Sequence, residues 1–172
     1  MKPNLAPSSE QWPIAFEKEK ARLLRTLRDW IIDIQHIGST AIPGLIAKPV
    51  IDIMIGVNNL EDADLHCVSK IQNLDYVYIK EYERDLPQRR YFQKTSETGV
   101  RTHQIHLVVM DSDWCKRRLL FRDYLRSHPD TAQEYGKLKQ LLAEKYLDAN
   151  AYASAKTPFI RKIETIACEE ER

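Results

Sequence analysis

The chain has 172 residues, which suits one compact domain with a hydrophobic core, so we expect a single domain over residues 1–172. Its 26 basic and 25 acidic residues give a net charge of +1, and this balance indicates no general attraction to nucleic acid or to a membrane surface. No apolar run approaches the roughly 18 residues of a membrane-spanning helix, and the N-terminus lacks the apolar core of a signal peptide. We therefore expect a cytoplasmic protein. The three cysteines are far apart and predict neither a disulfide framework nor a thiolate zinc site.

The first third of the sequence predicts a helix followed by two strands. After a loose arm over residues 1–8, apolar residues recur at helical spacing from Trp12 to about Trp30, behind a possible cap at Ser9. Residues 32–37 form a predicted strand that ends at Gly38, and residues 39–47 form a turn with a short helix. Residues 49–57 are apolar almost throughout, which is typical of a central strand covered on both faces.

The remainder predicts more strands and then helices only. A weaker helix is expected over residues 60–73, with Leu65, Val68 and Ile71 inward, and strands over 75–79, 89–94 and 103–109. Three helices follow: one capped by Ser112, one bearing an apolar stripe from Tyr135 to Tyr146, and one capped by Asn150. This order predicts an α+β fold, in which a small mixed sheet packs against helices and the C-terminal third is helical.

A single carboxylate interrupts the most apolar strand. Asp52 lies between Ile51 and Ile53, where an acid is costly unless a cation or hydrogen-bond donors satisfy it. We expect it to lie beside the Gly38-Ser39 turn, because a short helical loop joins the two neighbouring strands. Glycine there lets backbone N–H groups approach a phosphate, and further phosphate contacts are expected from the Ser39 and Thr40 hydroxyls and from Lys48. Alternatively, Asp52 only pins the turn by accepting backbone N–H bonds.

A second polar cluster occupies the strand that begins RTHQIH. His106 is a candidate metal ligand or proton carrier near Asp52, and His103 is a further candidate metal ligand, although it points to the other side unless a bulge intervenes. Arg89, Arg90 and Arg101 are candidates for an anion-binding rim. The alternatives are a hydrogen-bonded core histidine and a solvated hairpin edge. Several later residues are weaker candidates, with structural roles the default expectation: Arg122, Arg126, Tyr135, Lys139 and Lys156.

The motifs together resemble the GrpB family. The run HIGSTAIPGLIAKPVIDIMIGV, with RRYF, RTHQIHL, FRDYLRSHP, YGKLK and YASAKTPFI, carries the resemblance from Trp12 to about Ile160. It implies the nucleotidyltransferase superfamily, whose pattern is a Gly-Ser turn, about a dozen residues, then two acids on a strand and a third acid on a later strand. Such carboxylates hold two divalent metals that promote transfer of a nucleotidyl group.

The chain departs from that pattern at two positions. Met54 stands where the second acid belongs, and His106 stands where the third acid is expected. Mg²⁺ prefers oxygen ligands, whereas histidine favours Zn²⁺ or Mn²⁺, so the sequence does not support two-metal transfer. The resemblance also extends to the C-terminal extension of dephospho-CoA kinases, but the chain has no Gly-x-x-x-x-Gly-Lys-Ser/Thr motif of its own.

Three functions stay open from the sequence. The first is a nucleotidyltransferase-like enzyme with Asp52 and His106 as catalytic residues and Mg²⁺, Mn²⁺ or Zn²⁺ as cofactor. The second is a module that binds a nucleotide, a coenzyme-A-related compound or another phosphate compound in the same pocket without turnover. The third is a protein-interaction domain with a relic site. The fold alone does not decide among them, and the oligomeric state is not indicated.

Overall fold

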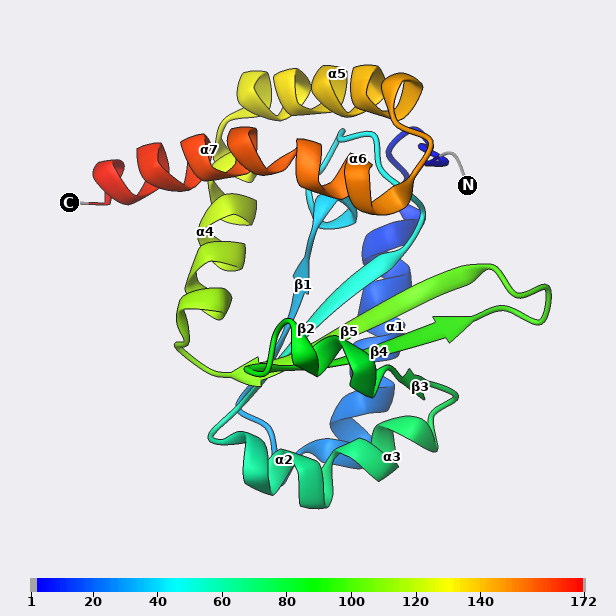
Figure 1. Cartoon of the computed structure of the whole chain (residues 1–172). Helices are drawn as coiled ribbons and strands as arrows, with labels where there is room; N and C mark the ends of the chain where they lie inside the picture. The colour runs from blue at the N-terminus through cyan, green and yellow to red at the C-terminus, as the bar shows by residue number, and fades with distance from the viewer. Residues whose placement is uncertain (1–2, 172) are drawn as a thin grey trace.

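A computed structural model describes residues 3–171 and shows a five-stranded mixed sheet surrounded by helices (Figure 1). The strand order is β1-β2-β5-β4-β3; β2 and β5 are parallel and the other neighbours antiparallel. The strands are β1 (Asp33–Ile37), β2 (Ile51–Val57), β3 (Val77–Tyr78), β4 (Arg89–Thr95) and β5 (Arg101–Val109). The helices are α1 (Gln11–Leu27), α2 (Leu60–His66), α3 (Val68–Gln72), α4 (Asp113–Ser127), α5 (Pro129–Lys145), α6 (Ala149–Ala155) and α7 (Thr157–Glu170), with two 3₁₀ turns, η1 (Ser39–Ala41) and η2 (Lys80–Arg84). The expected α+β class is confirmed.

One face of the sheet carries the main hydrophobic core. Ile51, Ile53 and Ile55 of β2 are buried there with Ile105 and Leu107 of β5. The apolar face of α1 and parts of α2 and α3 close this core. Alternation along each strand sends the intervening residues to the opposite face, so Asp52 and Met54 point away from α1.

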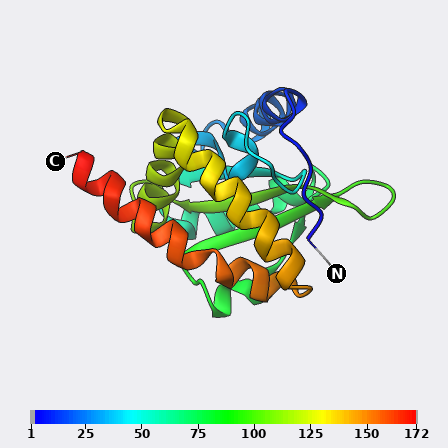
Figure 2. The ribbon, with the colours of Figure 1, turned by 90° about the horizontal axis from the view of Figure 1, so that it is seen from above.

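The opposite face of the sheet lies under the C-terminal helices. Figure 2 shows α1 on one side of the strands and α7 on the other. A small apolar cluster joins β1, β2 and β5 to α4, through Ile37, Met54, Val108 and Cys115. A second cluster joins the loop after η1 to α4, α5 and α7: Ile42, Leu45, Leu125, Ala132, Tyr135 and Ile163.

Several expected boundaries and orientations were wrong. Leu65 is 74% exposed, because α2 buries the side that carries Ala63. The final predicted helix is two helices, and Asp148 rather than Asn150 caps the first by accepting from the Ala151 N–H. The expected N-terminal arm is partly fixed, since Ala6 pairs with Ala47 through two backbone hydrogen bonds; residues 1–2 of that arm lie outside the described residues.

Other expectations of the elements were confirmed. The Ser112 side chain accepts a hydrogen bond from the Cys115 N–H and caps α4. Strand β2 has neighbours on both sides, as its apolar sequence indicated. In the part of the chain from 3 to 171, no helix has the length and apolar character needed to cross a membrane.

Candidate functional site

The turn after β1 touches the carboxylate of Asp52. Ile37 is the register partner of Asp52, so the next residue, Gly38, passes directly over that side chain. Gly38 has φ +73° and ψ −175°, a conformation that L side chains rarely adopt. A Cβ atom on Gly38 would lie 2.5 Å from Asp52 Oδ2. Glycine is therefore required here both by backbone conformation and by close approach.

A chain of hydrogen bonds fixes the other oxygen of Asp52. Its Oδ1 accepts from Gln104 Nε2 and from His106 Nε2, the latter at 3.0 Å. The Tyr91 hydroxyl donates to Gln104 Oε1 at 2.6 Å, and Gln93 Nε2 donates to that hydroxyl. Because the carbonyl oxygen of Gln104 faces Tyr91, its amide nitrogen faces Asp52. The network thus holds Asp52 as a hydrogen-bond acceptor.

The protonation of His106 follows from its second partner. Arg89 Nη1 lies 3.2 Å from His106 Nδ1, and a guanidinium can only donate, so Nδ1 accepts and Nε2 carries the proton toward Asp52. Burial lowers the pKa of His106, and the Asp52 carboxylate offsets this only in part. The ring also packs near Tyr91 and Trp114, at centroid distances of 5.4 and 5.1 Å. His106 therefore acts as a neutral donor that orients Asp52.

A cavity of about 180 Å³ opens in front of this carboxylate and the turn. Its walls come from the N-terminal arm, η1, β2, β5 and the C-terminal helices: Leu5, Ser39, Thr40, Ala47, Lys48, Val50, Asp52, Arg101, Gln104, Lys139, Tyr152 and Lys156. Four of these side chains are basic, and we call them the cationic cluster: Lys48, Arg101, Lys139 and Lys156. Asp52 is the one acidic residue among the lining residues.

Lys139 is the most deeply buried member of the cationic cluster. It projects from α5, is 2% exposed, and donates to the backbone oxygen of Ile46. Its ammonium group also lies 5.1 Å from the centre of the Tyr135 ring. Burial, with the nearby charges of Lys156 and Lys48, lowers the pKa of Lys139 to about 7. A buried ammonium of this kind is stabilised when an anion approaches.

Lys48 and Lys156 approach the cavity on either side of Tyr152. Their ammonium groups lie 5.0 and 4.5 Å from the centre of that ring. Burial and the charge of Lys48 lower the pKa of Lys156 to about 8, while Asp52 opposes this shift. Burial and Arg101 likewise lower the pKa of Lys48. Among the ion pairs formed within residues 3–171, none involves the cationic cluster.

The hydroxyl groups of the turn have different roles. Ser39 lines the cavity. The Thr40 hydroxyl is buried, bonds to His36 Nε2 at 2.9 Å and donates to the Val50 carbonyl, so it mainly holds the turn against β1 and β2. Arg126 Nε donates to the Ala41 carbonyl. Arg126 therefore supports the turn and does not line the cavity.

Two predicted site residues lie elsewhere. His103 is on the face of β5 that packs toward α1, where burial lowers its pKa and Glu19 opposes the shift, so it cannot share a ligand with Asp52. Arg90 also points to that face, and its guanidinium forms a bidentate pair with Asp64 at 2.6 and 2.8 Å. The bulge in this hairpin falls at Lys94/Thr95, and alternation from residue 103 to 106 is unbroken.

Lys139 and Lys156, only weaker candidates from the sequence, are lining residues of the cavity. The available signal was that Lys139 follows Tyr135 by one helical turn, on the inward side of α5. Nothing local indicated that Lys156, at the junction of α6 and α7, reaches the same cavity. That contact depends on how the C-terminal helices fold back over the sheet (Figure 1).

The residues around Asp52 do not fit a protein-held divalent metal. Met54, at the position of the expected second acid, is fully buried in the apolar cluster with Val108 and Cys115. Both ring nitrogens of His106 are engaged. Across residues 3–171, no three histidine, cysteine or acidic side chains gather in a metal-binding arrangement. One carboxylate facing four basic groups is a poor donor set for Mg²⁺.

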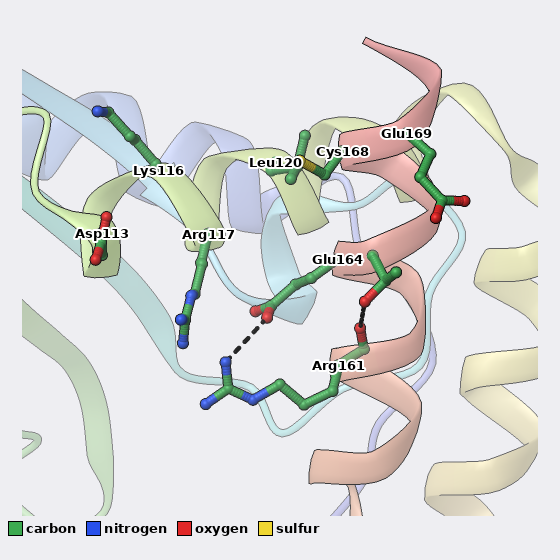
Figure 3. Close-up of a pocket in the computed structure, with 9 residues that line it drawn as sticks. Asp113, Lys116, Arg117, Leu120, Arg161, Glu164, Cys168 and Glu169 are labelled. Carbon is green, nitrogen blue, oxygen red and sulfur yellow. Dashed lines mark hydrogen bonds and ion pairs between the residues drawn. The ribbon is translucent and has the colours of Figure 1, made fainter. Parts of the chain in front are cut away.

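A larger groove between α4 and α7 has a different character. It encloses about 500 Å³ and presents three basic and three acidic side chains, with Arg161 paired to Glu164 (Figure 3). Such mixed charge gives no preference for an anionic ligand. The smaller cavity at Asp52 is therefore the better candidate site.

The fold and site define an α+β protein in which a glycine-serine turn and a strand carboxylate face a cationic cavity. The chain belongs to the GrpB family: the family model described as GrpB protein matches residues 2–165. The glutamate-rich protein GrpB of Alkalihalophilus pseudofirmus is 36% identical over 162 residues, which are 92% of each chain. The UPF0157 protein YqkA of Bacillus subtilis is 40% identical over 157 residues, 91% of this chain but 44% of YqkA.

The crystal structure of conserved protein GrpB from Enterococcus faecalis matches with a TM-score of 0.86 and 35% identity, covering 98% of this chain and 99% of that one. A dephospho-CoA kinase of Mycolicibacterium paratuberculosis is 27% identical over 179 residues, covering 91% of this chain and 44% of the kinase.

Proposed function

We propose that this protein binds a nucleotide or another phosphate-bearing small molecule in the cavity between the Gly38-Ser39 turn, Asp52 and the cationic cluster. The observation that carries the proposal is the convergence of four basic side chains, none in an ion pair with a carboxylate of residues 3–171, on a glycine turn beside a single acid. Buried ammonium groups are stabilised by an anion, and phosphate oxygens accept hydrogen bonds from lysine and arginine. The cavity is too small for a whole nucleotide, so the phosphate group would occupy it.

The turn and strand resemble those of nucleotidyltransferases, and this resemblance supports a phosphate-bearing ligand as the class of ligand. Asp52 and His106, the residues that the sequence suggested as catalytic, form a hydrogen-bonded pair that orients the carboxylate. Metal-assisted nucleotidyl transfer is not favoured, because the second acid is replaced by the buried Met54. Binding without nucleotidyl transfer is the function that this geometry supports best.

A coenzyme-A-related ligand is a specific second candidate. The relative named dephospho-CoA kinase aligns with 91% of this chain. Coenzyme A carries a pyrophosphate bridge, which would suit the same cationic cavity. Coenzyme A therefore belongs in the first panel of ligands beside ATP.

Thermal unfolding tests the proposal directly. The protein would be heated alone and with ATP, coenzyme A, inorganic pyrophosphate and, as a phosphate-free control, adenosine. A ligand at about 100 times its dissociation constant adds roughly 2.7 kcal/mol, which for this chain length raises the melting temperature by roughly 5–10 °C. Lys139→Met should abolish the shift. If no phosphate compound raises the melting temperature above the adenosine control, the proposed function is wrong.

A further inference from the structure

Only one oxygen of the Asp52 carboxylate is left to coordinate a metal ion. Oδ1 already accepts from Gln104 and His106. Oδ2 lies against the Gly38 backbone, so close that even a methyl group would not fit between them. Mg²⁺ prefers about six oxygen ligands in near-octahedral geometry, and the cavity lining supplies one carboxylate. A divalent ion here would depend on oxygen atoms of the ligand and of water.

The cationic cluster supplies positive charge where a metal ion would otherwise supply it. Its three lysines and one arginine line the same 180 Å³ cavity as Asp52. Lys139 is 2% exposed, and its only hydrogen bond within the described residues is to a backbone carbonyl. A buried cation that lacks a carboxylate partner destabilises the free protein, and this free-energy cost is offset when an anion enters the cavity. A divalent cation in the same space would add to the repulsion.

We infer that the site takes the diphosphate or triphosphate group of its ligand without a divalent metal ion, with the cationic cluster neutralising the phosphate charge. The inference rests on the proposed function and names the class of ligand. A monophosphate carries a charge of roughly −1.5 to −2 near neutral pH. The positive charge of four basic groups, after subtraction of one acid, is larger than this. A second or third ionised phosphate gives the closer match. Lysine and arginine thus replace the metal ions used by two-metal transferases.

Isothermal titration with inorganic pyrophosphate separates this inference from the proposed function. Titrations at constant ionic strength would be run in EDTA and in excess MgCl₂, with inorganic phosphate as the short comparison ligand. We expect pyrophosphate to bind in EDTA, at least tenfold more tightly than phosphate, and no more tightly in MgCl₂. Binding that requires Mg²⁺ would overturn the inference and leave the proposed function standing. Absence of binding by pyrophosphate, ATP and coenzyme A in either buffer would overturn both.

The sign of the effect of Asp52→Asn gives a second test. If a metal bridged Asp52 to the phosphates, this variant would lose affinity. If the cationic cluster binds the phosphates directly, removing a negative charge from the cavity should tighten pyrophosphate binding severalfold in EDTA. The asparagine oxygen still accepts from His106, so the local network is retained. Weaker binding by Asp52→Asn would contradict the inference.

Matched lysine variants locate the binding energy. Lys156→Gln should weaken pyrophosphate binding at least tenfold, whereas Lys162→Gln, an exposed lysine on α7 outside the cavity lining, should not change it. Arg101→Gln provides a further test at an exposed strand position, where surface substitutions usually change stability little. Arg90→Ala should leave binding unchanged, because Arg90 pairs with Asp64 on the opposite face of the sheet. Equal binding by Lys156→Gln, Arg101→Gln and wild type would overturn the inference.

Discussion

Replacing Gly38 by alanine should be far more damaging than the same change at another glycine with a similar φ. Gly38 has φ +73°, and a Cβ atom there would lie 2.5 Å from Asp52 Oδ2 and 3.0 Å from Asp52 Cβ. Asp52 cannot move away freely, because Gln104 and His106 hold its other oxygen. Gly44 has φ +75°, but its Cβ would meet nothing within 4 Å. Gly44→Ala is therefore a control that is matched in φ but lacks the close contact.

The magnitudes follow from these two terms. Strain at such a positive φ costs roughly 1–3 kcal/mol, and it is the only cost at Gly44. At Gly38 the contact with a fixed carboxylate adds to the strain, so the total should reach about 3 kcal/mol or more. For a chain of this length, each kcal/mol lowers the melting temperature by about 2–4 °C. Gly38→Ala should then melt roughly 6–12 °C below wild type.

Urea unfolding and calorimetry of four variants check this prediction: Gly38→Ala, Gly44→Ala, Asp52→Ala and the double variant Gly38→Ala/Asp52→Ala. The Asp52→Ala change removes the carboxylate that the new methyl group meets. In that background Gly38→Ala should cost at least about 1 kcal/mol less than in wild type, a coupling typical of residues in contact. If Gly38→Ala costs no more than Gly44→Ala, the close approach between the turn and Asp52 does not exist as described.

Three further changes test the rest of the structure. Lys139→Met should raise the free energy of unfolding below about pH 7, where the buried ammonium of the wild type is charged. The pKa of Lys139 is about 7 in the folded state and higher in the unfolded state. The gain in stability should therefore shrink between pH 7 and pH 10, by up to about 1.4 kcal/mol per pH unit. Urea titrations at several pH values measure it, and a pH-independent difference would count against a charged, buried Lys139. Glu19→Gln should lower the free energy of unfolding by about 2–3 kcal/mol, since the buried carboxylate accepts from the Tyr76 hydroxyl at 3.0 Å and pairs with Lys94 at 3.2 Å. A loss below about 0.5 kcal/mol in urea unfolding would show that these contacts matter little. Arg122→Met should lower the free energy of unfolding by about 2 kcal/mol in a thermal melt, because Nη1 of Arg122 donates to Gln35 Oε1 and to the His36 carbonyl. Arg117→Met, at an exposed position of the same helix, is the control, and equal stability of the two variants would refute this role.

Local sequence patterns were sufficient to predict most elements. Helical spacing located α1 and α5, the Ser112 cap located α4, and the apolar run of β2 correctly indicated an internal strand. The proximity of Gly38 and Asp52 could be predicted because a short connection joins the two neighbouring strands that carry them. The final predicted helix should have been divided, because Pro158 in the first turn of α7 signals a new helix start, and Asp148 provides the cap that was expected at Asn150.

Long-range packing decided what the sequence could not. His103 is next to the lining residue Gln104, and Arg90 is next to Arg89, which contacts His106, but strand alternation sends both to the α1 face because no bulge intervenes between residues 103 and 106. Lys139 and Lys156 were only weaker candidates, with structural roles as the default, because lysine is seldom buried. Only the return of α5 and α6 over the sheet brings them within reach of Asp52. Basic residues that come from distant segments of the chain show no spacing pattern in the sequence, so their convergence could not be predicted from it.

The cavity is assembled from both extremities of the chain. Leu5 comes from the arm that pairs with Ala47, and Lys156 comes from the junction of the last two helices. A fragment that stopped before α5 would keep the turn and the acid yet lack two of the four positive groups. A phosphate compound bound in this cavity would consequently connect the N-terminal arm with the C-terminal helices, so that ligand binding would also stabilise the whole fold.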